Sequence, residues 1–168
     1  MTEEREIRIV PAYDHADEIR ELFREYTEML VEGDPKVADF LALQHYHEEI
    51  RNLEWKYGMP EGRLYIVYVD GKAAGCGGFR KLDDERCELK RIYIRPQYRG
   101  HKLGYTLTRK LIKDAADAGY RWMYLDTMWF LDAAKKMYRD LGFTETERYN
   151  DSPVDGTVFL RMELETDR

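Results

Sequence analysis

The stretch formed by residues 86–118 restricts the fold of this chain more than any other part of it. Residues 86–94 read as a β-strand, and Pro96 closes it because proline has no amide hydrogen to donate to a sheet. A short basic loop follows, and residues 101–118 then repeat apolar side chains at helical spacing. A strand that runs through a tight loop directly into a helix is typical of domains in which helices pack against a sheet.

The rest of the chain supplies further strands and helices in an order that fits one α+β domain. Further strands are expected at residues 6–10, 63–69, 72–81, 121–126, 143–148 and 158–164. Further helices are expected at residues 16–31, 37–53 and 130–141. Asp70-Gly71 is a strong signal for a β-hairpin. We therefore expect a single domain over residues 1–168, with a mixed, mostly antiparallel sheet of about six to seven strands flanked by about four helices.

The composition of the chain excludes several classes of protein. The 168 residues are 43% hydrophobic, which is enough for one buried core. No apolar run approaches the roughly 18 residues of a membrane span, and the charged start lacks the apolar stretch of a secretory signal. The two cysteines, Cys76 and Cys87, form neither a disulfide framework nor a zinc quartet. We expect a cytoplasmic protein with no membrane partner.

Charge is distributed unevenly along the chain. The net charge is −6, which argues against a nucleic-acid partner. Residues 1–62 carry 16 acidic and 7 basic side chains, whereas residues 63–168 carry 17 acidic and 20 basic ones. Residues 86–113 hold nine Lys or Arg and one acid, Glu88. This basic run is either a solvated surface or an anion-binding site.

The loop before the helix at residues 101–118 has features of a phosphate site. The first amides of a helix have no internal partner and lie at its positive dipole end. Gly100 and Gly104 let a ligand approach the backbone closely, and Arg99 and Lys102 add positive charge. The glycine spacing matches neither a Walker loop nor a dinucleotide fingerprint. Spacing alone leaves phosphate binding open.

Two motifs resemble the GNAT superfamily of acyl-CoA-dependent N-acyltransferases. The cofactor motif of that family, Arg/Gln-x-x-Gly-x-Gly/Ala, follows a strand and opens the central helix; here it reads Arg99-Gly-His-Lys-Leu-Gly104, with Lys102 in place of the middle glycine. Downstream, Ala134-x-x-x-Tyr138-x-x-x-Gly-Phe143 is similar to a second family segment. Leu131 stands where the family often has asparagine.

The resemblance implies an N-acetyltransferase that moves the acetyl group of acetyl-CoA to a primary amine by direct attack in a ternary complex, with no metal. The cofactor-binding residues it implies are Ile92, Tyr93, Ile94, Arg99, Gly100, His101, Lys102, Leu103, Gly104 and Tyr105. A backbone N–H near Tyr93 or Ile94 would meet the developing oxyanion. An alternative from another class is a non-catalytic acyl-CoA-binding sensor or regulatory module.

Glu88 is the candidate general base. An alkylammonium has a pKa of about 10.4, so the acceptor must lose a proton before it attacks. The family often has a glutamate base on the strand that leads into the cofactor loop. Strand alternation predicts that Glu88, Lys90, Ile92 and Ile94 share one face, and partial burial would raise the pKa of Glu88. The alternative is an ordinary ion pair with Lys90 or Arg91.

Tyr138 is the candidate general acid, since a tyrosine at this motif position protonates the departing thiolate in the family. Helical spacing points Tyr138 inward. The alternative is a core tyrosine whose hydroxyl is bonded elsewhere.

Other sites and partners are less strongly indicated. His45 and His47 could suggest a metal, but residues two apart on a helix face different ways. Neither cysteine has an activating base nearby in the sequence to make it an acyl-carrying nucleophile. In the family the first two helices wall the acceptor pocket, and here they are acidic, which favours a cationic amine. We also allow for a homodimer.

Overall fold

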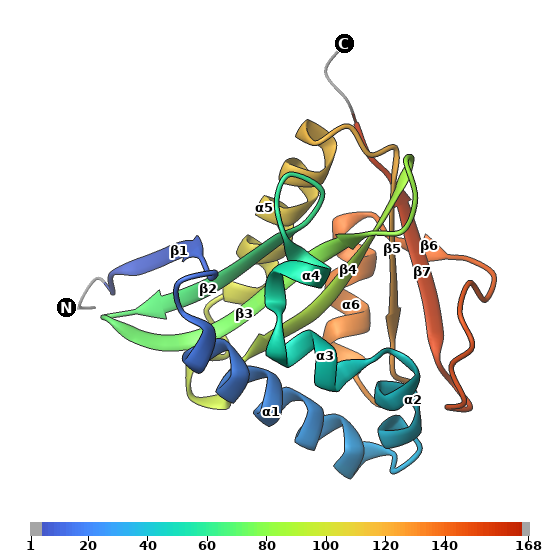
Figure 1. The fold of residues 1–168 in the computed structure, drawn as a ribbon, viewed down its shortest axis with the longest axis horizontal. Coiled ribbons are helices and arrows are strands. Elements are labelled where there is room, and N and C mark those ends of the chain that lie inside the picture. The colour runs from blue at the N-terminus through green and yellow to red at the C-terminus, as the bar shows by residue number, and fades with distance from the viewer. Residues whose placement is uncertain (1–4, 166–168) are drawn as a thin grey trace.

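A seven-stranded sheet forms the centre of the protein, as the computed structural model, which describes residues 5–165, shows (Figure 1). Its strands are β1 (Ile7–Pro11), β2 (Arg63–Val69), β3 (Lys72–Lys81), β4 (Arg86–Ile94), β5 (Trp122–Thr127), β6 (Thr144–Glu145) and β7 (Val158–Glu163). Their order is β1-β2-β3-β4-β5-β7-β6, and every neighbouring pair is antiparallel except β4 and β5. The expected mixed, mostly antiparallel α+β fold is confirmed.

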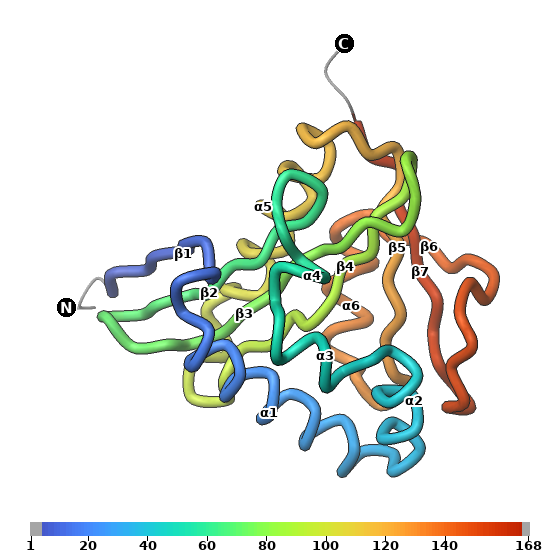
Figure 2. Tube along the Cα trace, viewed as in Figure 1, coloured from blue at the N-terminus to red at the C-terminus, as the bar shows by residue number. Residues whose placement is uncertain are grey.

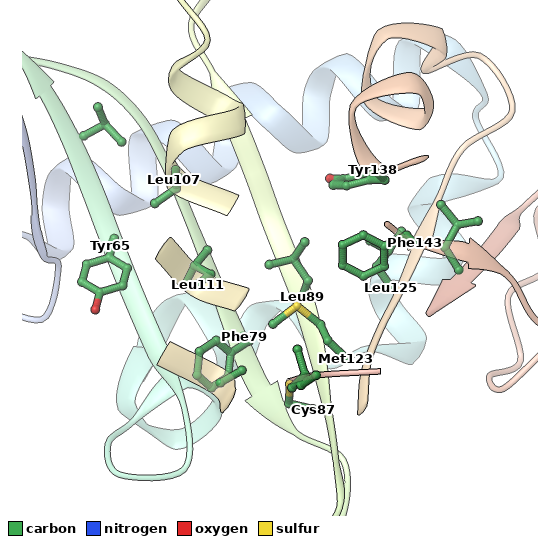
Figure 3. Packing of buried hydrophobic residues seen from close by; sticks show 14 of the residues in the cluster. Tyr65, Phe79, Cys87, Leu89, Leu107, Leu111, Met123, Leu125, Tyr138 and Phe143 are labelled. Atoms are coloured by element: carbon green, nitrogen blue, oxygen red, sulfur yellow. The ribbon is translucent and has the colours of Figure 1, made fainter. Parts of the chain in front are cut away.

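Helices cover both faces of this sheet. They are α1 (Ala16–Gly33), α2 (Val37–Leu43), α3 (Tyr46–Arg51), α4 (Leu53–Tyr57), α5 (Leu103–Asp117) and α6 (Asp132–Leu141), with a 3-10 turn at Pro96–Tyr98. On one face α5 and α6 bury the larger core, in which Leu107 and Leu111 of α5 lie against sheet residues such as Phe79 (Figure 3). On the other face α1 and α4 pack through Phe23 and Tyr57.

The helical stretch expected at residues 37–53 is three short helices, so residues 5–165 hold six α-helices rather than about four. His45 has a left-handed backbone, with φ 58°, which ends α2 and turns the chain. Asn52 then starts α4, because its side chain accepts a hydrogen bond from the Trp55 amide at 3.2 Å. The strand expected at residues 143–148 is also shorter, since only Thr144–Glu145 pairs with β7.

A β-bulge in β4 changes which side chains share a face. Cys76 pairs with Tyr93 and Gly78 with Lys90, so Gly77 lies opposite two residues of β4. One of them, Arg91, has φ 62°. An extra residue on one strand reverses the alternation beyond it. The expectation that Glu88 and Lys90 share a face with Ile92 and Ile94 is therefore wrong.

The two sides of the bulge face different parts of the molecule. Lys90 and Arg91, although adjacent, both reach Gln44 at the end of α2. Ile92 and Ile94 pack instead with the core that α5 and α6 cover.

The parallel strands β4 and β5 separate early. Their pairing runs from Arg86–Trp122 to Glu88–Tyr124 and ends there, although β4 continues to Ile94 and β5 to Thr127. Figure 2 shows the two strands diverging, with α6 beside the widening gap. The backbone thus opens the sheet at its centre, at the end where the basic loop begins.

Candidate active site

A cavity of 630 Å³ opens where β4 and β5 diverge; we call it the splay cavity. Its walls come from the ends of β4 and β5, the loop before α5, and parts of α1 and α6. Nine of the ten predicted cofactor-binding residues line it: Ile92, Tyr93, Ile94, Arg99, Gly100, Lys102, Leu103, Gly104 and Tyr105. His101 is exposed and does not line it. That these residues bind a cofactor stays a prediction.

The loop at the mouth of the splay cavity presents unbonded amides. Gly100 has φ +90° and Lys102 has φ 59°, so the chain turns sharply into α5. The first hydrogen bond of α5 runs from the Thr106 amide to the Lys102 carbonyl at 3.0 Å. The amides of residues 103–105 precede that bond and have no partner within the helix. Such amides at the positive end of a helix suit phosphate oxygens.

Three cations near this loop have no carboxylate within ion-pair distance among residues 5–165: Arg99, Lys102 and Arg109. The other basic side chains of residues 86–113 are engaged, as when Arg95 pairs with Glu25 at 2.7 Å. Arg99 is held in place by a bond from its Nε to the Ile94 carbonyl at 3.0 Å. The basic run is therefore partly an internal ion-pair network, and of its three unpaired cations Arg99 and Lys102 line the splay cavity.

Tyr138 lies in the wall of the splay cavity. It is buried, and its ring packs edge-on against Phe143 at 5.7 Å between centroids (Figure 3). Burial raises the pKa of Tyr138 well above its ordinary value, with a smaller contribution from Tyr26 and Asp126. The hydroxyl therefore stays protonated at neutral pH and can act as a proton donor. The inward orientation agrees with the sequence prediction, and the role of Tyr138 as a general acid stays a prediction.

A second cavity of 780 Å³, the polar cavity, lies on the face of the sheet that carries α2 and α4. Glu88 and Lys90 of β4, Arg80 of β3 and Tyr149 form part of its wall. Three acids, Glu54, Glu61 and Asp151, are exposed at its edge. The predicted base and the predicted acid thus lie in the walls of different cavities.

Glu88 is an ion-paired carboxylate with both oxygens occupied. Its Oε1 accepts from Arg80 Nε at 2.8 Å and lies 3.6 Å from Lys90 Nζ, and its Oε2 accepts from the Tyr149 hydroxyl at 2.6 Å. Burial by itself would raise the pKa of Glu88, but the charges of Lys90 and Arg80 and the Tyr149 hydrogen bond lower it to about 2. The expected rise in pKa is wrong, because the sequence could not show which cations surround the carboxylate.

A second buried carboxylate, Glu49 of α3, fixes the bulge. It accepts two hydrogen bonds from Arg91, at 2.8 and 2.9 Å, one from Lys56 at 2.7 Å and one from the Tyr57 hydroxyl at 2.8 Å. Burial would raise the pKa of Glu49, but the adjacent Arg91 and Lys56 cations hold it well below its usual range. Sequence patterns cannot reveal this cluster, because Arg91 and Glu49 are 42 residues apart in the chain.

Asp126, at the end of β5, is a candidate that sequence reasoning missed. It lines the splay cavity and also a 20 Å³ cavity that shares Gln44 with the polar cavity. Its Oδ2 accepts from Asn150 Nδ2 at 2.8 Å. Burial raises the pKa of Asp126, and the charge of Glu88 adds to the rise against the attraction of Lys90. The one feature of the sequence that could have identified Asp126 as a site residue is its position as an acid at the end of an apolar strand.

The alternative chemistries find no support in the geometry. Cys76 and Cys87 are free and buried, and burial raises the pKa of both thiols, so neither is poised as a nucleophile. Residues 5–165 contain no group of three side chains placed to hold a metal ion. No helix among them is long and apolar enough to cross a membrane.

Comparison with known proteins places this arrangement in a family. Residues 16–143 match the acetyltransferase (GNAT) family. The chain is 36% identical to an uncharacterized N-acetyltransferase of Schizosaccharomyces pombe over 74% of its own length and 77% of that protein. It is 29% identical to an uncharacterized N-acetyltransferase of Dictyostelium discoideum, over 94% of its own length and 99% of that protein.

Solved structures share the fold. An acetyltransferase from Streptococcus agalactiae superposes with a TM-score of 0.74 at 21% identity, covering 97% of this chain and 100% of that one. The PaiA N-acetyltransferase from Thermoplasma acidophilum, in complex with coenzyme A, superposes with a TM-score of 0.70 at 17% identity, covering 95% and 99%.

Proposed function

This chain belongs to the acetyltransferase (GNAT) family, and we propose that it transfers the acetyl group of acetyl-CoA to a primary amine by direct attack in a ternary complex. The observation that carries the proposal is a pair of cavities that each share a lining residue, Asp126 or Gln44, with the same small cavity. One opens between β4 and β5 beside unbonded helix amides, and the other lies on the opposite face of β4. A thioester and an amine can then approach each other from different sides.

Acetyl-CoA is the cosubstrate that fits the splay cavity. The amides of residues 103–105 and the free charges of Arg99 and Lys102 would bind its phosphates. The apolar side chains of Ile92 and Ile94 would flank the part of the cosubstrate between the diverging strands. The coenzyme A complex of the Thermoplasma protein, which has the same fold, supports this choice.

Tyr138 is the general acid of the proposed reaction. The amine nitrogen forms a bond to the thioester carbon, the carbon–sulfur bond breaks, and the Tyr138 hydroxyl gives its proton to the departing sulfur. A backbone N–H beyond the bulge of β4, near Tyr93 or Ile94, would stabilise the oxyanion. The Glu49–Arg91 pair supports that geometry, because it holds the residue with positive φ that redirects the strand.

The proton lost by the amine needs a base, and Asp126 suits this role better than Glu88. The oxygens of Glu88 are occupied, and its pKa of about 2 makes it a weak proton acceptor. Asp126 lines the splay cavity and the small cavity that shares Gln44 with the polar cavity, and its raised pKa brings it closer to the working range of a general base. We therefore assign the role of proton acceptor to Asp126. Glu88 is assigned a positioning role toward Arg80 and Tyr149.

The cationic acceptor expected from the sequence is not favoured by the polar cavity. Of the 16 acidic side chains of residues 1–62, the six on α1 do not line the polar cavity, and Glu54 and Glu61, which do line it, share its wall with Lys56, Arg80, Lys81 and Lys90. The two free cysteines agree with a reducing compartment such as the cytoplasm, and a homodimer stays a prediction.

Release of coenzyme A from acetyl-CoA, followed with a thiol reagent across a panel of amines, tests the proposal. Release that depends on the amine, together with an acetylated product of the expected mass, supports the enzyme. Tight acetyl-CoA binding by calorimetry without release for any amine would indicate the non-catalytic sensor instead.

A further inference from the structure

The floor of the polar cavity holds more positive charge than its own carboxylates use. Four cations, Lys56, Arg80, Lys90 and Arg91, lie in or just beneath that floor. The carboxylates in contact with them are Glu49 and Glu88. Asp126 is a further acid that acts on Lys90, and burial raises its pKa, but even with Asp126 counted the three acids are outnumbered by the four cations. The floor is therefore net positive.

Arg80 has hydrogen-bonding capacity that the protein leaves unused. Within residues 5–165 its guanidinium makes one side-chain hydrogen bond, from Nε to Glu88, and its side chain is 35% exposed in the cavity wall. A guanidinium has five N–H donors, four of them on its two terminal nitrogens, and one from each terminal nitrogen can bind a carboxylate in parallel.

Lys90 is a second cation with unused donors. Its ammonium group donates to Gln44 Oε1 at 2.9 Å and lies 3.6 Å from Glu88, although the side chain is only 6% exposed. An ammonium has three donors, and a buried cation with one hydrogen bond is costly unless another anion reaches it. Burial lowers the pKa of Lys90 and Arg91 lowers it further, against the opposing charges of Glu88, Asp126 and Glu49. The ammonium group therefore keeps donors that a bound anion can use.

Lys56, which also lines the polar cavity, is affected by the same neighbouring positive charges. Burial lowers the pKa of Lys56 to about 8, and the charge of Lys90 contributes although Glu49 opposes it. Glu54, Glu61 and Asp151 also line the cavity, but they are exposed to solvent, and within residues 5–165 none of them forms an ion pair with Lys56, Arg80 or Lys90. A cationic acceptor reaching the floor would meet like charges there, whereas an anionic group would compensate them.

We propose that the acceptor is a small primary amine that also carries a carboxylate, and that Arg80 and Lys90 bind this carboxylate in the polar cavity. The inference rests on the proposed acetyltransferase function. Glu88 holds Arg80 through Nε and leaves its terminal nitrogens facing the ligand. The amine end of the same molecule then extends toward Asp126, and the carboxylate sets which amines are accepted.

Matched acceptor pairs test the proposal. The probes are alanine with alaninamide, aspartate with asparagine, and β-alanine with its amide, plus putrescine as a cationic amine. We expect kcat/KM for the best carboxylate amine to exceed that of its amide at least 10-fold. Arg80→Gln should raise KM for the carboxylate amine about 10- to 100-fold, with a much smaller effect on kcat, and should raise KM for its amide far less, so that the preference for the carboxylate is lost.

Arg121→Gln is the control, because it removes the same charge from an exposed residue that pairs with Glu163 and lines neither cavity. It should retain the full preference. Equal or better use of the amides or of putrescine by the wild-type protein would overturn the proposal and leave the acetyltransferase function intact.

A binding measurement separates the proposed carboxylate subsite from the proposed acetyltransferase activity. Calorimetric titration of the coenzyme A-loaded protein with each probe reports carboxylate preference without turnover. If no amine causes coenzyme A release, the proposed function fails, and a carboxylate preference that Arg80→Gln abolishes would still support the anion subsite. Binding without such a preference would overturn the subsite.

Discussion

At the scale of single residues, two carboxylates on adjacent strands have opposite properties. Glu88 is surrounded by Arg80, Lys90 and the Tyr149 hydroxyl, all of which favour its charged form. Asp126 is partly exposed and accepts one hydrogen bond from the Asn150 amide, and desolvation raises its pKa. The physical cause is the number of compensating partners, because desolvation acts on both. This difference decides which of them can exchange protons during turnover.

The pH dependence of the rate should separate these carboxylates. Asp126→Asn should lower kcat/KM about 10²- to 10⁴-fold and remove the acidic limb of its pH profile, because the base is lost. Glu88→Gln should keep that limb, since a group with a pKa of about 2 does not titrate in the working range. Initial rates between pH 5 and 9 provide the measurement. Loss of the limb in Glu88→Gln alone would restore Glu88 as the base.

Tyr138→Phe should slow turnover without weakening cosubstrate binding. The hydroxyl is the proton donor in the proposed reaction, whereas the ring supplies the contact with Phe143, which phenylalanine keeps. We expect kcat to fall roughly 10- to 10³-fold while the acetyl-CoA affinity barely changes. The deficit should shrink with a thioester whose leaving thiol has a low pKa. A change confined to cosubstrate affinity would make Tyr138 only a wall of the cavity.

At the scale of elements, the N-terminus of α5 is built for close approach. The residue before the helix, Lys102, has a left-handed backbone, and Gly104 lies in the first turn. A Cβ at Gly104 would meet Met137 Sδ at 3.5 Å and Ile94 Cγ1 at 3.7 Å, which are ordinary contacts. The helix itself therefore has no steric need for glycine there. We expect an incoming ligand to need the space that the glycine leaves.

Gly104→Ala should thus separate stability from binding. Alanine in a helix is favoured over glycine by about 1 kcal/mol, so Tm should hold or rise. Acetyl-CoA affinity should fall at least 10-fold, because the methyl group enters the space beside the free amides. Gly104→Asp should nearly abolish binding through charge repulsion with the phosphates. Calorimetry and thermal melting give both quantities.

Thr106→Asp is the control for the aspartate variant, since it adds the same charge to an exposed residue of the same helix that does not line the splay cavity. It should lose much less affinity. Unchanged affinity in a folded Gly104→Asp protein would contradict the assignment of this cavity to acetyl-CoA.

At the scale of the whole molecule, buried charges join the short helices to the sheet. Glu49 of α3 is fully buried and receives Arg91 from β4, Lys56 from α4 and the Tyr57 hydroxyl. Removal of one partner from such a cluster leaves uncompensated charge in the interior, which costs more than the intact cluster contributes. The same cluster holds the bulge that separates the two cavities. Stability and site geometry therefore depend on shared contacts.

Glu49→Ala should lower the free energy of unfolding by about 3–5 kcal/mol, because Arg91 and Lys56 would lose their buried anion. Glu48→Ala, at the exposed neighbour in the same helix, should change it by no more than about 0.5 kcal/mol. Denaturant titration measures both variants. Equal losses of unfolding free energy in the two variants would mean that the Glu49 cluster does not stabilise the packing of α3 against the sheet.

Acid should destabilise the protein in a defined range. Glu88 has a folded pKa of about 2 against an ordinary value near 4.5, so it contributes stability that is complete above about pH 4.5 and is lost as the pH falls toward 2. Glu49, whose pKa is also lowered, adds to the loss in the same direction. Tm measured between pH 7 and 2 should fall mainly below pH 4.5. The fall should be shallower in Glu88→Gln, and an equal fall would contradict the pKa assignment.

The sequence by itself determined the parts of this protein that depend on local chain properties. The hairpin at Asp70-Gly71 and the proline after β4 are signals carried by adjacent residues, and β2, β3 and β4 have the expected bounds. The two motifs likewise predicted the loop before α5 and the inward position of Tyr138. The family followed from the same short segments.

Only the tertiary structure decided the electrostatics of the site. The bulge at Arg91 is maintained by Glu49 from another element, and it reversed the predicted faces of β4. The pKa of Glu88 depends on Arg80, Lys90 and Tyr149, the last of them 61 residues away. Distant residues meet only after folding, and a charge in a low-dielectric interior is governed by its nearest partners. The sequence could therefore name the acidic candidates but not assign their roles.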